Sequence, residues 1–193
     1  MKNIIIIGAG DLGKEIVWLI EDINKVKPTY VILGFLDDNV EKTGKDFFGY
    51  KVLGTTELLD KLSEKSPFCA VIAIQNGAVR RAIVEGHPDF EQWETIVHPT
   101  AVIAPECDLS KGNIIFPRVT ASVDTKIGQF SLLYMNATVC NDCTIGDYAS
   151  IMTGVVVSEH VVIENGAFLP AGMCVAPHTS VPAQHSACDN EGR

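Results

Sequence analysis

In the second half of the chain an apolar residue recurs at every sixth position without exception. Every sixth residue from Val97 to Val181 is apolar, and only Ala121 among these fifteen is not Ile, Leu or Val. An α-helix repeats every 3.6 residues and a strand every two, so neither produces this period. Repeats of six residues are typical of a parallel β-helix, a solenoid in which three hexads form one triangular coil. The pattern predicts about five coils of 18 residues, with an irregular β-sandwich as the alternative.

The first half of the chain has a different pattern, in which strands and helices alternate. Apolar runs predict strands at 4–7, 31–36 and 69–74, and helical spacing predicts helices at 12–24, at 78–85 and from Thr55 or Thr56 to Glu64. This βαβαβ order predicts a parallel sheet with right-handed crossovers. We therefore expect a Rossmann-like α/β domain over residues 1–96, a β-helix over 97–183 and a flexible polar tail over 184–193.

Composition argues against several classes of protein. The 193 residues carry a net charge of −9, and neither half has the basic stripe that nucleic acid binding needs. The apolar run at 4–7 is too short for a membrane span or a signal peptide, so we expect a cytoplasmic protein. Six cysteines in a chain of this size favour reduced thiols over a disulfide framework.

Three glycines mark a candidate phosphate-binding loop between the first predicted strand and helix. Gly8, Gly10 and Gly13 have the G-x-G-x-x-G spacing, which allows a tight turn and leaves N–H groups at the helix N-terminus for an anion. Asp37 follows the second predicted strand, where an acidic residue contacts a ribose or a base. Asp11 places a competing carboxylate at the same helix end. A loop with a structural role only, and an NAD site, remain alternatives.

Polar residues spaced 18 apart form a candidate catalytic column. Residues at this spacing in a β-helix stack on adjacent coils, about 4.8 Å apart. The column comprises Glu106, Asp124, Asp142, His160 and His178, and Asn141 lies beside it. Asp142 next to His160 predicts a base and its orienting carboxylate, because a carboxylate favours the imidazolium and fixes the tautomer. A solvated corner without function, and a metal site on His160 and His178, are the alternatives.

Two other motifs favour structural roles. Cys140 and Cys143 form a C-x-x-C pair, but three extended residues span roughly 10 Å and the odd spacing points the two side chains to opposite faces. A disulfide needs Cα atoms within about 7 Å, so we expect Cys143 to fill a small slot inside the solenoid. His98 precedes Pro99 at the domain junction, where we expect a packing role.

The order of motifs along the chain resembles that of a known family. The motifs are Gly8–Gly13 (GAGDLG), Phe35–Asn39 (FLDDN), Val71–Ile74 (VIAI), Val97–Ala101 (VHPTA), Asn141–Asp147 (NDCTIGD) and Val181–Ala183 (VPA). Together they resemble the sugar acyltransferases of the left-handed β-helix class. That class includes the sialic acid O-acetyltransferases and the N-acetyltransferases of UDP- or dTDP-linked 4-amino sugars. The resemblance implies a Rossmann-like α/β domain followed by a left-handed parallel β-helix.

The same resemblance implies an activity and its site. It implies an acetyl-CoA-dependent acetyltransferase, without a metal, acting on an amino group or hydroxyl of a nucleotide-activated or sialic-acid-like sugar. It also implies a homotrimer in which CoA lies between adjacent subunits, bordered by Glu159, Pro170 and Ala171. The nucleotide-sugar is expected at the Gly8–Gly13 loop and at Asp37, Asp38, Ile74 and Asn76.

Several features depart from the family pattern. The family's catalytic base is a His before an Asp-Cys pair, where this chain has Asn141; a second His nine residues later is Ser150, and Asp11-Leu12 replaces Gly-His in the glycine loop. The solenoid is also about one coil short. Because Asn141 cannot act as a base at neutral pH, we expect His160 to accept the proton and Asn141 to hydrogen-bond the substrate. The alternatives are an impaired homologue that binds a nucleotide-sugar or partners an active enzyme, and an oxidoreductase that uses the glycine loop.

Overall fold

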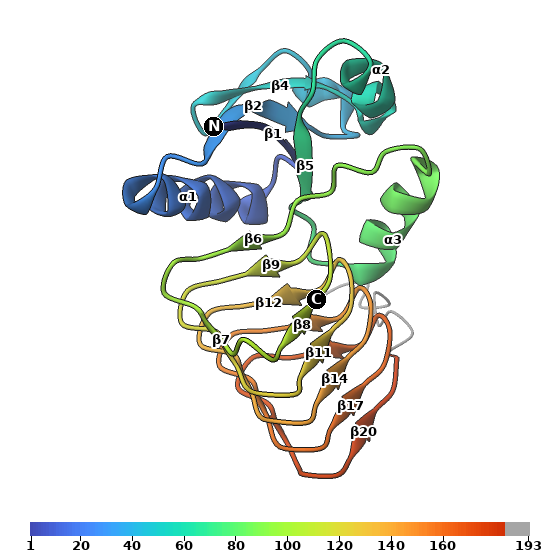
Figure 1. Ribbon diagram of the computed structural model, residues 1–193. Helices are drawn as coiled ribbons and strands as arrows, with labels where there is room; N and C mark the ends of the chain where they lie inside the picture. The colour runs from blue at the N-terminus through green and yellow to red at the C-terminus, as the bar shows by residue number, and fades with distance from the viewer. Residues whose placement is uncertain (184–193) are drawn as a thin grey trace, which may run out of the picture.

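The computed structural model describes residues 1–183, and the tail expected over 184–193 lies outside the described residues. Figure 1 shows an N-terminal α/β domain that rests on a solenoid of stacked coils, next to strands β6, β9 and β12. Within residues 1–183 no helix is long and apolar enough to cross a membrane.

The N-terminal domain contains a five-stranded sheet and three helices. Its strands are β1 (Lys2–Ile7), β2 (Tyr30–Leu36), β3 (Asp46–Phe47), β4 (Tyr50–Gly54) and β5 (Cys69–Ile72), in the order β3-β4-β2-β1-β5. Its helices are α1 (Asp11–Val26), α2 (Leu59–Ser63) and α3 (Gly77–Gly86), with 3-10 turns at Val40–Lys42 and Thr56–Leu58. The pairs among β4, β2, β1 and β5 are parallel, and β3 pairs antiparallel with β4.

The alternating side chains of β1 divide the core of this domain in two. Ile4 and Ile6 pack with the apolar stripe of α1, in a cluster that continues into the solenoid interior. Ile5 and Ile7 pack with the other cluster, which includes Leu59 of α2. The four isoleucines are therefore buried on both faces of the sheet, as is typical of a parallel strand between helices.

The strands and helices predicted for this half are confirmed to within two residues, except in two places. The β3–β4 hairpin was not predicted, and its turn places Phe48 and Gly49 at φ angles of 47° and 85°. The helix expected to be capped by Thr55 or Thr56 begins instead with a 3-10 turn. The Thr56 N–H and hydroxyl both donate to Asp38 Oδ1, at 2.8 and 2.7 Å, so Thr56 is bound to the neighbouring strand end and does not cap.

The solenoid consists of two-residue strands arranged in three parallel five-stranded sheets. Each strand pairs with the strand 18 residues away, as Thr120 does with Thr138. The expected left-handed β-helix of about five coils is therefore confirmed.

We name the three faces of the prism by what distinguishes their outward side chains. The docked face consists of β6 (Ile96–Val97), β9 (Ile114–Ile115), β12 (Leu132–Leu133), β15 (Ser150–Ile151) and β18 (Phe168–Leu169). The neutral face consists of β7 (Val102–Ile103), β10 (Thr120–Ala121), β13 (Thr138–Val139), β16 (Val156–Val157) and β19 (Cys174–Val175). The charged face consists of β8 (Asp108–Leu109), β11 (Lys126–Ile127), β14 (Thr144–Ile145), β17 (Val162–Ile163) and β20 (Ser180–Val181).

In each strand the second residue points into the prism and the first points outward. The inward residues from Ile115 to Val175 are all buried, which explains the apolar period of six. On the docked face, the outward residues Ile96, Ile114 and Leu132 are buried too, because the N-terminal domain lies against them. The outward residues of the neutral face carry no charge, whereas the charged face presents an aspartate and a lysine.

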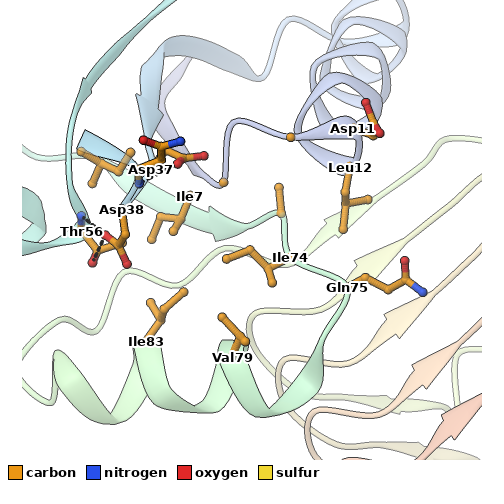
Figure 2. Close-up of a pocket in the computed structure, with 15 residues that line it drawn as sticks. Ile7, Asp11, Leu12, Asp37, Asp38, Thr56, Ile74, Gln75, Val79 and Ile83 are labelled. Atoms are coloured by element: carbon orange, nitrogen blue, oxygen red, sulfur yellow. Dashed lines mark hydrogen bonds between the residues drawn. The ribbon is translucent and has the colours of Figure 1, made fainter. Parts of the chain in front are cut away.

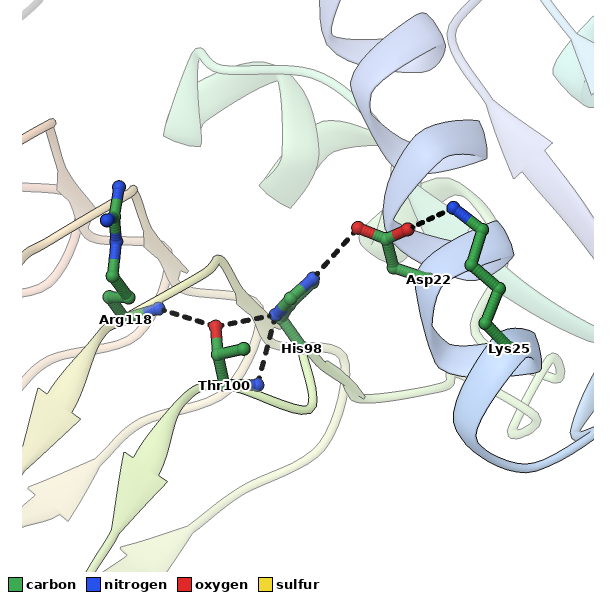
Figure 3. A network of polar contacts seen from close by, with 5 residues as sticks. All are labelled: Asp22, Lys25, His98, Thr100 and Arg118. Carbon is green, nitrogen blue, oxygen red and sulfur yellow. Dashed lines mark hydrogen bonds and ion pairs between the residues drawn. The ribbon is translucent and has the colours of Figure 1, made fainter.

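His98 joins the two domains, as Figure 3 shows. Its imidazole is buried, with Nε2 3.3 Å from Asp22 Oδ2 of α1 and Nδ1 2.9 Å from Thr100 Oγ1. Asp22 also binds Lys25 Nζ at 2.7 Å, and the His98 ring lies 6.0 Å from the ring of Trp18. The packing role expected for His98 is therefore confirmed.

Candidate functional site

A cleft of about 480 Å³ opens at the carboxyl ends of β1, β2 and β5. This end of a parallel sheet is where ligands bind in doubly wound folds. The lining comprises part of the glycine loop, the strand ends and the start of α3, as Figure 2 shows: Ile7, Gly8, Gly10, Asp11, Leu12, Leu36, Asp37, Asp38, Asn39, Thr56, Ala73, Ile74, Gln75, Val79 and Ile83. Its charged lining residues are all acidic.

The glycines of the loop serve two different purposes. Gly8 has a φ of +107°, and a Cβ there would lie 2.7 Å from Ala73 O; a Cβ on Gly13 would lie 2.4 Å from Gly8 O. These two glycines are therefore required by the fold itself. A Cβ on Gly10 would meet no described atom within 4 Å. Gly10 instead leaves room beside the first N–H groups of α1, where an anionic ligand can approach.

Asp37 holds the glycine loop in place. Its Oδ2 accepts from Ala9 N–H and Lys42 Nζ, both at 2.8 Å, and its Oδ1 accepts from Asn39 N–H at 3.0 Å. Burial alone would raise the pKa of Asp37, but the hydrogen bonds from Lys42, Asn39 and Ala9 outweigh burial and lower it. Neither the sequence spacing nor any motif indicated Lys42, which also donates to Ala9 O at 2.9 Å.

The two substrate-binding residues expected after β5, Ile74 and Asn76, have different positions in the structure. Ile74 lines the cleft. Asn76, directly after Gln75, caps α3, with Oδ1 accepting from Ala78 N–H at 2.9 Å, and its contact with the substrate stays a prediction. Gln75, which the sequence did not single out, lines the cleft and reaches the solenoid, with Nε2 3.5 Å from Met152 Sδ. The one feature of the sequence that could have indicated Gln75 as a cleft residue is its position between β5 and α3.

The residues of the candidate column stack as the 18-residue spacing predicts. His160 Nδ1 lies 3.9 Å from Asp142 Oδ2, and the His160 and His178 rings stack at 4.7 Å between centroids. Asp124 and these three residues all have φ between 55° and 57° at the same corner. The Asp142 carboxylate also accepts from Asn141 Nδ2 at 2.6 Å. His160 and Asp142 are each nearly half exposed, so the pair faces solvent in the single chain.

One chain does not bring the cleft and the column together. The cleft lies beside the docked face: Gln75 contacts Met152 at the corner with the neutral face, and α3, which carries the lining residues Val79 and Ile83, lies against Tyr148 at the corner with the charged face. His160 lies in the corner loop between β16 and β17, where the neutral face meets the charged face. The column therefore lies at the corner opposite the docked face, one face width away from the cleft.

The three residues expected to border CoA are divided in the same way. Glu159 precedes His160 at the corner between the neutral and charged faces. Pro170 and Ala171 follow β18 at the corner between the docked and neutral faces. They lie at opposite edges of the neutral face and form no common site within one chain.

The two cysteines of the C-x-x-C pair have different surroundings. Cys140 and Cys143 are both free thiols, and Cys143 is buried with Sγ 3.0 Å from Ser158 O, as expected for a residue inside the solenoid. Burial raises the pKa of the Cys143 thiol. In the part of the chain that the structure describes, no three His, Cys, Asp or Glu side chains are grouped to hold a metal ion.

Two family models match the chain. The model for the PglD N-terminal domain matches residues 3–86, and the model for the bacterial transferase hexapeptide (six repeats) matches residues 124–159. No curated protein sequence matched the chain.

Solved structures share the two-domain fold. A histidine-to-asparagine variant of perosamine N-acetyltransferase from Caulobacter crescentus, in complex with CoA and GDP-perosamine, aligns with a TM-score of 0.77 and 22% identity over 93% of this chain and 91% of that chain. The acetyltransferase domain of PglB from Neisseria gonorrhoeae FA1090, in complex with acetyl coenzyme A, aligns with a TM-score of 0.73 and 23% identity over 92% and 93%. WeeI from Acinetobacter baumannii AYE aligns with a TM-score of 0.64 and 25% identity over 93% and 88%. The chain therefore has the same two-domain fold as these proteins.

Proposed function

We propose that the protein is an acetyl-CoA-dependent acetyltransferase that acts on the amino group of a nucleotide-activated sugar. The observation that carries this proposal is the cleft at the carboxyl ends of the parallel strands, in a domain packed directly on a hexapeptide solenoid. The matches to the PglD N-terminal domain and to the transferase hexapeptide support one half each.

The ligands of the similar structures support the same pairing of substrates. Perosamine N-acetyltransferase binds CoA and GDP-perosamine together, and the PglB domain binds acetyl coenzyme A. The perosamine enzyme was solved with an asparagine replacing a histidine and still holds both ligands. Replacement of a histidine by asparagine in that protein is therefore compatible with binding of CoA and GDP-perosamine, which supports binding of both substrates by a chain that has Asn141.

In this proposal the N-terminal cleft binds the nucleotide. The first N–H groups of α1, beside Gly10, receive the diphosphate, because a helix N-terminus favours negative charge. Asp38, exposed at the same cleft, accepts a donor from the ribose or base. Asp37 contributes by keeping the loop in position, since its carboxylate is already engaged by Ala9, Asn39 and Lys42.

The acetyl donor is proposed to lie between two copies of the chain. The outward residues of the neutral face are Val102, Thr120, Thr138, Val156 and Cys174, all uncharged. A homotrimer that buries this face brings the Glu159 edge of one copy next to the Pro170 edge of another. The same packing brings His160 towards the cleft of a second copy and so completes the site.

The chemistry then requires one proton transfer and no cofactor beyond acetyl-CoA. The neutral amine attacks the thioester carbon, a C–N bond forms, the C–S bond breaks and the CoA thiolate leaves and is protonated. His160 accepts the proton from the amine, and Asp142 beside its Nδ1 stabilises the resulting imidazolium. Asn141 hydrogen-bonds the acceptor. A positioned general base contributes typically 10²–10⁴-fold to the rate.

The test is release of CoA thiol with GDP-, UDP- and dTDP-linked amino sugars. We expect turnover with the wild type, a loss of about 10²-fold or more in His160→Asn, and a gain in Asn141→His. Asparagine is chosen for residue 160 because it tolerates the left-handed conformation there. His178→Asn is the matched control, one coil away at the same corner. Turnover with none of the sugars would refute the activity, and an active preparation in which His160→Asn matches wild type would refute the role of His160.

A further inference from the structure

Arg80 is a buried cation in the contact between the two domains. It lies in the first turn of α3 and is 2% exposed. Its donors reach six acceptors: Nε to Phe130 O (2.8 Å), Nη1 to Ile74 O (2.9 Å) and Gln75 O (2.6 Å), and Nη2 to Tyr148 O (2.8 Å), Ala149 O (2.9 Å) and Ser150 Oγ (3.1 Å). All six acceptors are uncharged, and burial lowers the pKa of Arg80 to about 10.

The shape of the guanidinium matches the stacking of the coils. Phe130 and Tyr148 are 18 residues apart, and both have positive φ, at 54° and 58°, at the corner between the charged and docked faces. Their carbonyls therefore lie on adjacent coils, about 4.8 Å apart. The planar fork of arginine presents Nε and Nη2 to these two carbonyls while Nη1 points back to the N-terminal domain. A lysine has one nitrogen and cannot reach both sides.

On its other side, Arg80 holds the wall of the cleft. Ile74 and Gln75, whose carbonyls bind Nη1, both line the cleft. The hydroxyl of Ser150, on the docked face, donates to the same Gln75 carbonyl at 2.8 Å. The wall of the cleft is thus hydrogen-bonded, through one guanidinium and one hydroxyl, to the coils beneath it.

Holding the N-terminal domain on the solenoid does not by itself require a buried cation. The same junction already contains apolar contacts, with the Trp93 and Phe130 rings 5.5 Å apart and the Phe130 and Tyr148 rings stacked at 5.4 Å. Burying a charge without a carboxylate costs free energy that apolar packing would avoid. What six directed hydrogen bonds add is a fixed relative position of the parts they join.

We propose that Arg80, assisted by Ser150, is a positioning residue for acetyl transfer: it sets the position of the sugar-binding cleft relative to the solenoid that carries the acetyl donor and His160. This inference rests on the proposed function. Because the solenoid face fixes the neighbouring copy, the contact made by Arg80 also sets the distance from the amine to the His160 of that copy. A displacement of about 1 Å in such a geometry costs on the order of 10²-fold in rate.

The test compares Arg80→Lys, Arg80→Met and Ser150→Ala with matched controls. Arg81→Lys changes the next residue of α3, whose guanidinium lies 5.1 Å from the Tyr148 ring centroid and is exposed. Ser131→Ala removes another buried hydroxyl, which donates to Gly146 O at 2.8 Å and accepts from Ala149 N–H at 3.1 Å, both within the solenoid. Turnover with the accepted sugar is measured by CoA release, and titration calorimetry with UDP, GDP, dTDP and CoA measures binding.

We expect kcat to fall about 10- to 100-fold in both Arg80 variants and a few-fold in Ser150→Ala. Affinities for the nucleoside diphosphate and for CoA, and KM, should stay within about threefold, and the two controls should keep the wild-type kcat. Arg80→Lys keeps the charge, so a wild-type kcat in that variant would refute the positioning role. Unchanged kcat per folded molecule with a lower melting temperature would also refute it and leave Arg80 purely structural. A wild type that transfers no acetyl group would refute the proposed function itself, and with it this role.

Discussion

The carboxylate of Asp37 is surrounded by donors from its own loop. It binds Ala9 N–H, Asn39 N–H and the Lys42 ammonium, so its removal leaves three donors without their acceptor. Among residues 1–183, its neighbour Asp38 binds only Thr56, through one oxygen, and is exposed. Two adjacent carboxylates with the same chemistry therefore have separable contributions, one to the fold of the loop and one to the ligand.

We expect Asp37→Ala to lower the free energy of unfolding by about 1–3 kcal/mol, because it leaves partly buried donors unsatisfied. It should also abolish the rise in melting temperature that a nucleotide-sugar produces by binding the folded state. Asp38→Ala should keep the melting temperature of the free protein within about 2 °C, since a ΔΔG of about 0.5 kcal/mol shifts Tm by only about 1–2 °C in this size range. It should also lose part of the ligand-induced rise. Equal destabilisation by the two substitutions would contradict this division.

The lowered pKa of Asp37 gives a dependence on pH. A carboxyl whose pKa is lower in the folded state stabilises the fold fully above its ordinary value of 3.8 and loses that contribution as the pH falls below it. We expect the difference in unfolding free energy between wild type and Asp37→Asn to be constant from pH 5 to pH 7 and to shrink below about pH 3.8. Urea titrations at each pH measure it, and a difference that persists at pH 2 would argue against the ionised form as the source.

At the scale of elements, two glycines determine how closely chain segments approach. Gly13 brings α1 against the Gly8 carbonyl, and Gly77 brings α3 against the solenoid, where a Cβ would lie 2.2 Å from Tyr148 O. Neither neighbour is a flexible side chain that could move away. Each glycine has a counterpart at which an added Cβ would meet open space: Gly10, directly before α1, and Gly86, the last residue of α3.

We expect Gly77→Ala to push α3 away from the solenoid and to cost about 1–3 kcal/mol of stability, as overpacking does. Gly86→Ala, in the same helix, should change stability by less than about 1 kcal/mol. Thermal unfolding measures both, and amide exchange of residues 74–80 should quicken in Gly77→Ala alone. A neutral Gly77→Ala would show that the contact adjusts without cost.

Gly13→Ala and Gly10→Ala should separate folding from binding in the glycine loop. The first should destabilise the protein, because of the clash with Gly8 O. The second should fold normally and weaken the binding of UDP, GDP or dTDP, because its methyl group occupies the space beside the α1 N-terminus. Full nucleotide affinity in a folded Gly10→Ala protein would place the diphosphate elsewhere.

The sequence predicts these elements unevenly, for physical reasons. In a solenoid of 18-residue coils, residues 18 apart in the sequence stack on adjacent coils. Asp142 and His160 could therefore be placed as neighbours from their residue numbers alone. The docked face also has a readable signal, because the outward residues Ile96, Ile114 and Leu132 are apolar where a solvent-facing strand would be polar. Arg80 had no such signal, since an arginine in a helix looks exposed until the acceptors of another domain surround it.

At the scale of the whole molecule, the three faces differ in what their outward residues can contact. The docked face is covered by the N-terminal domain of the same chain, and the charged face is compatible with exposure to solvent. The neutral face presents Val156 and Val102 without charged neighbours in its strands. The separation of cleft and column in one chain supports the same inference that packing of copies completes the site.

We expect the wild type to have three times the mass of the 20.9 kDa chain in light scattering. Val156→Lys, on the neutral face, should shift it to the monomer and abolish turnover, because burying an unpaired charge opposes association. Val162→Lys is the matched control, a valine of similar exposure on the charged face (45% against 37%), and it should leave the mass unchanged. A monomeric wild type at micromolar concentration, or a dissociated Val162→Lys, would argue against the neutral face as the interface.

The 18-residue register has a consequence for how proteins of this architecture change in length. An insertion of one hexad between Asp142 and His160 would move every later strand to the next face, so that His160 would leave the column of Asp142 and lie at the corner between the charged and docked faces. An insertion or deletion of a whole coil beyond Met152, the last residue in hydrogen-bond contact with the N-terminal domain among those described, keeps each face and corner in place. Lengths of related chains should therefore differ in steps of 18 residues within the solenoid, and a count of residues between the Val97–Ala101 motif and the closing Val181–Ala183 motif tests it.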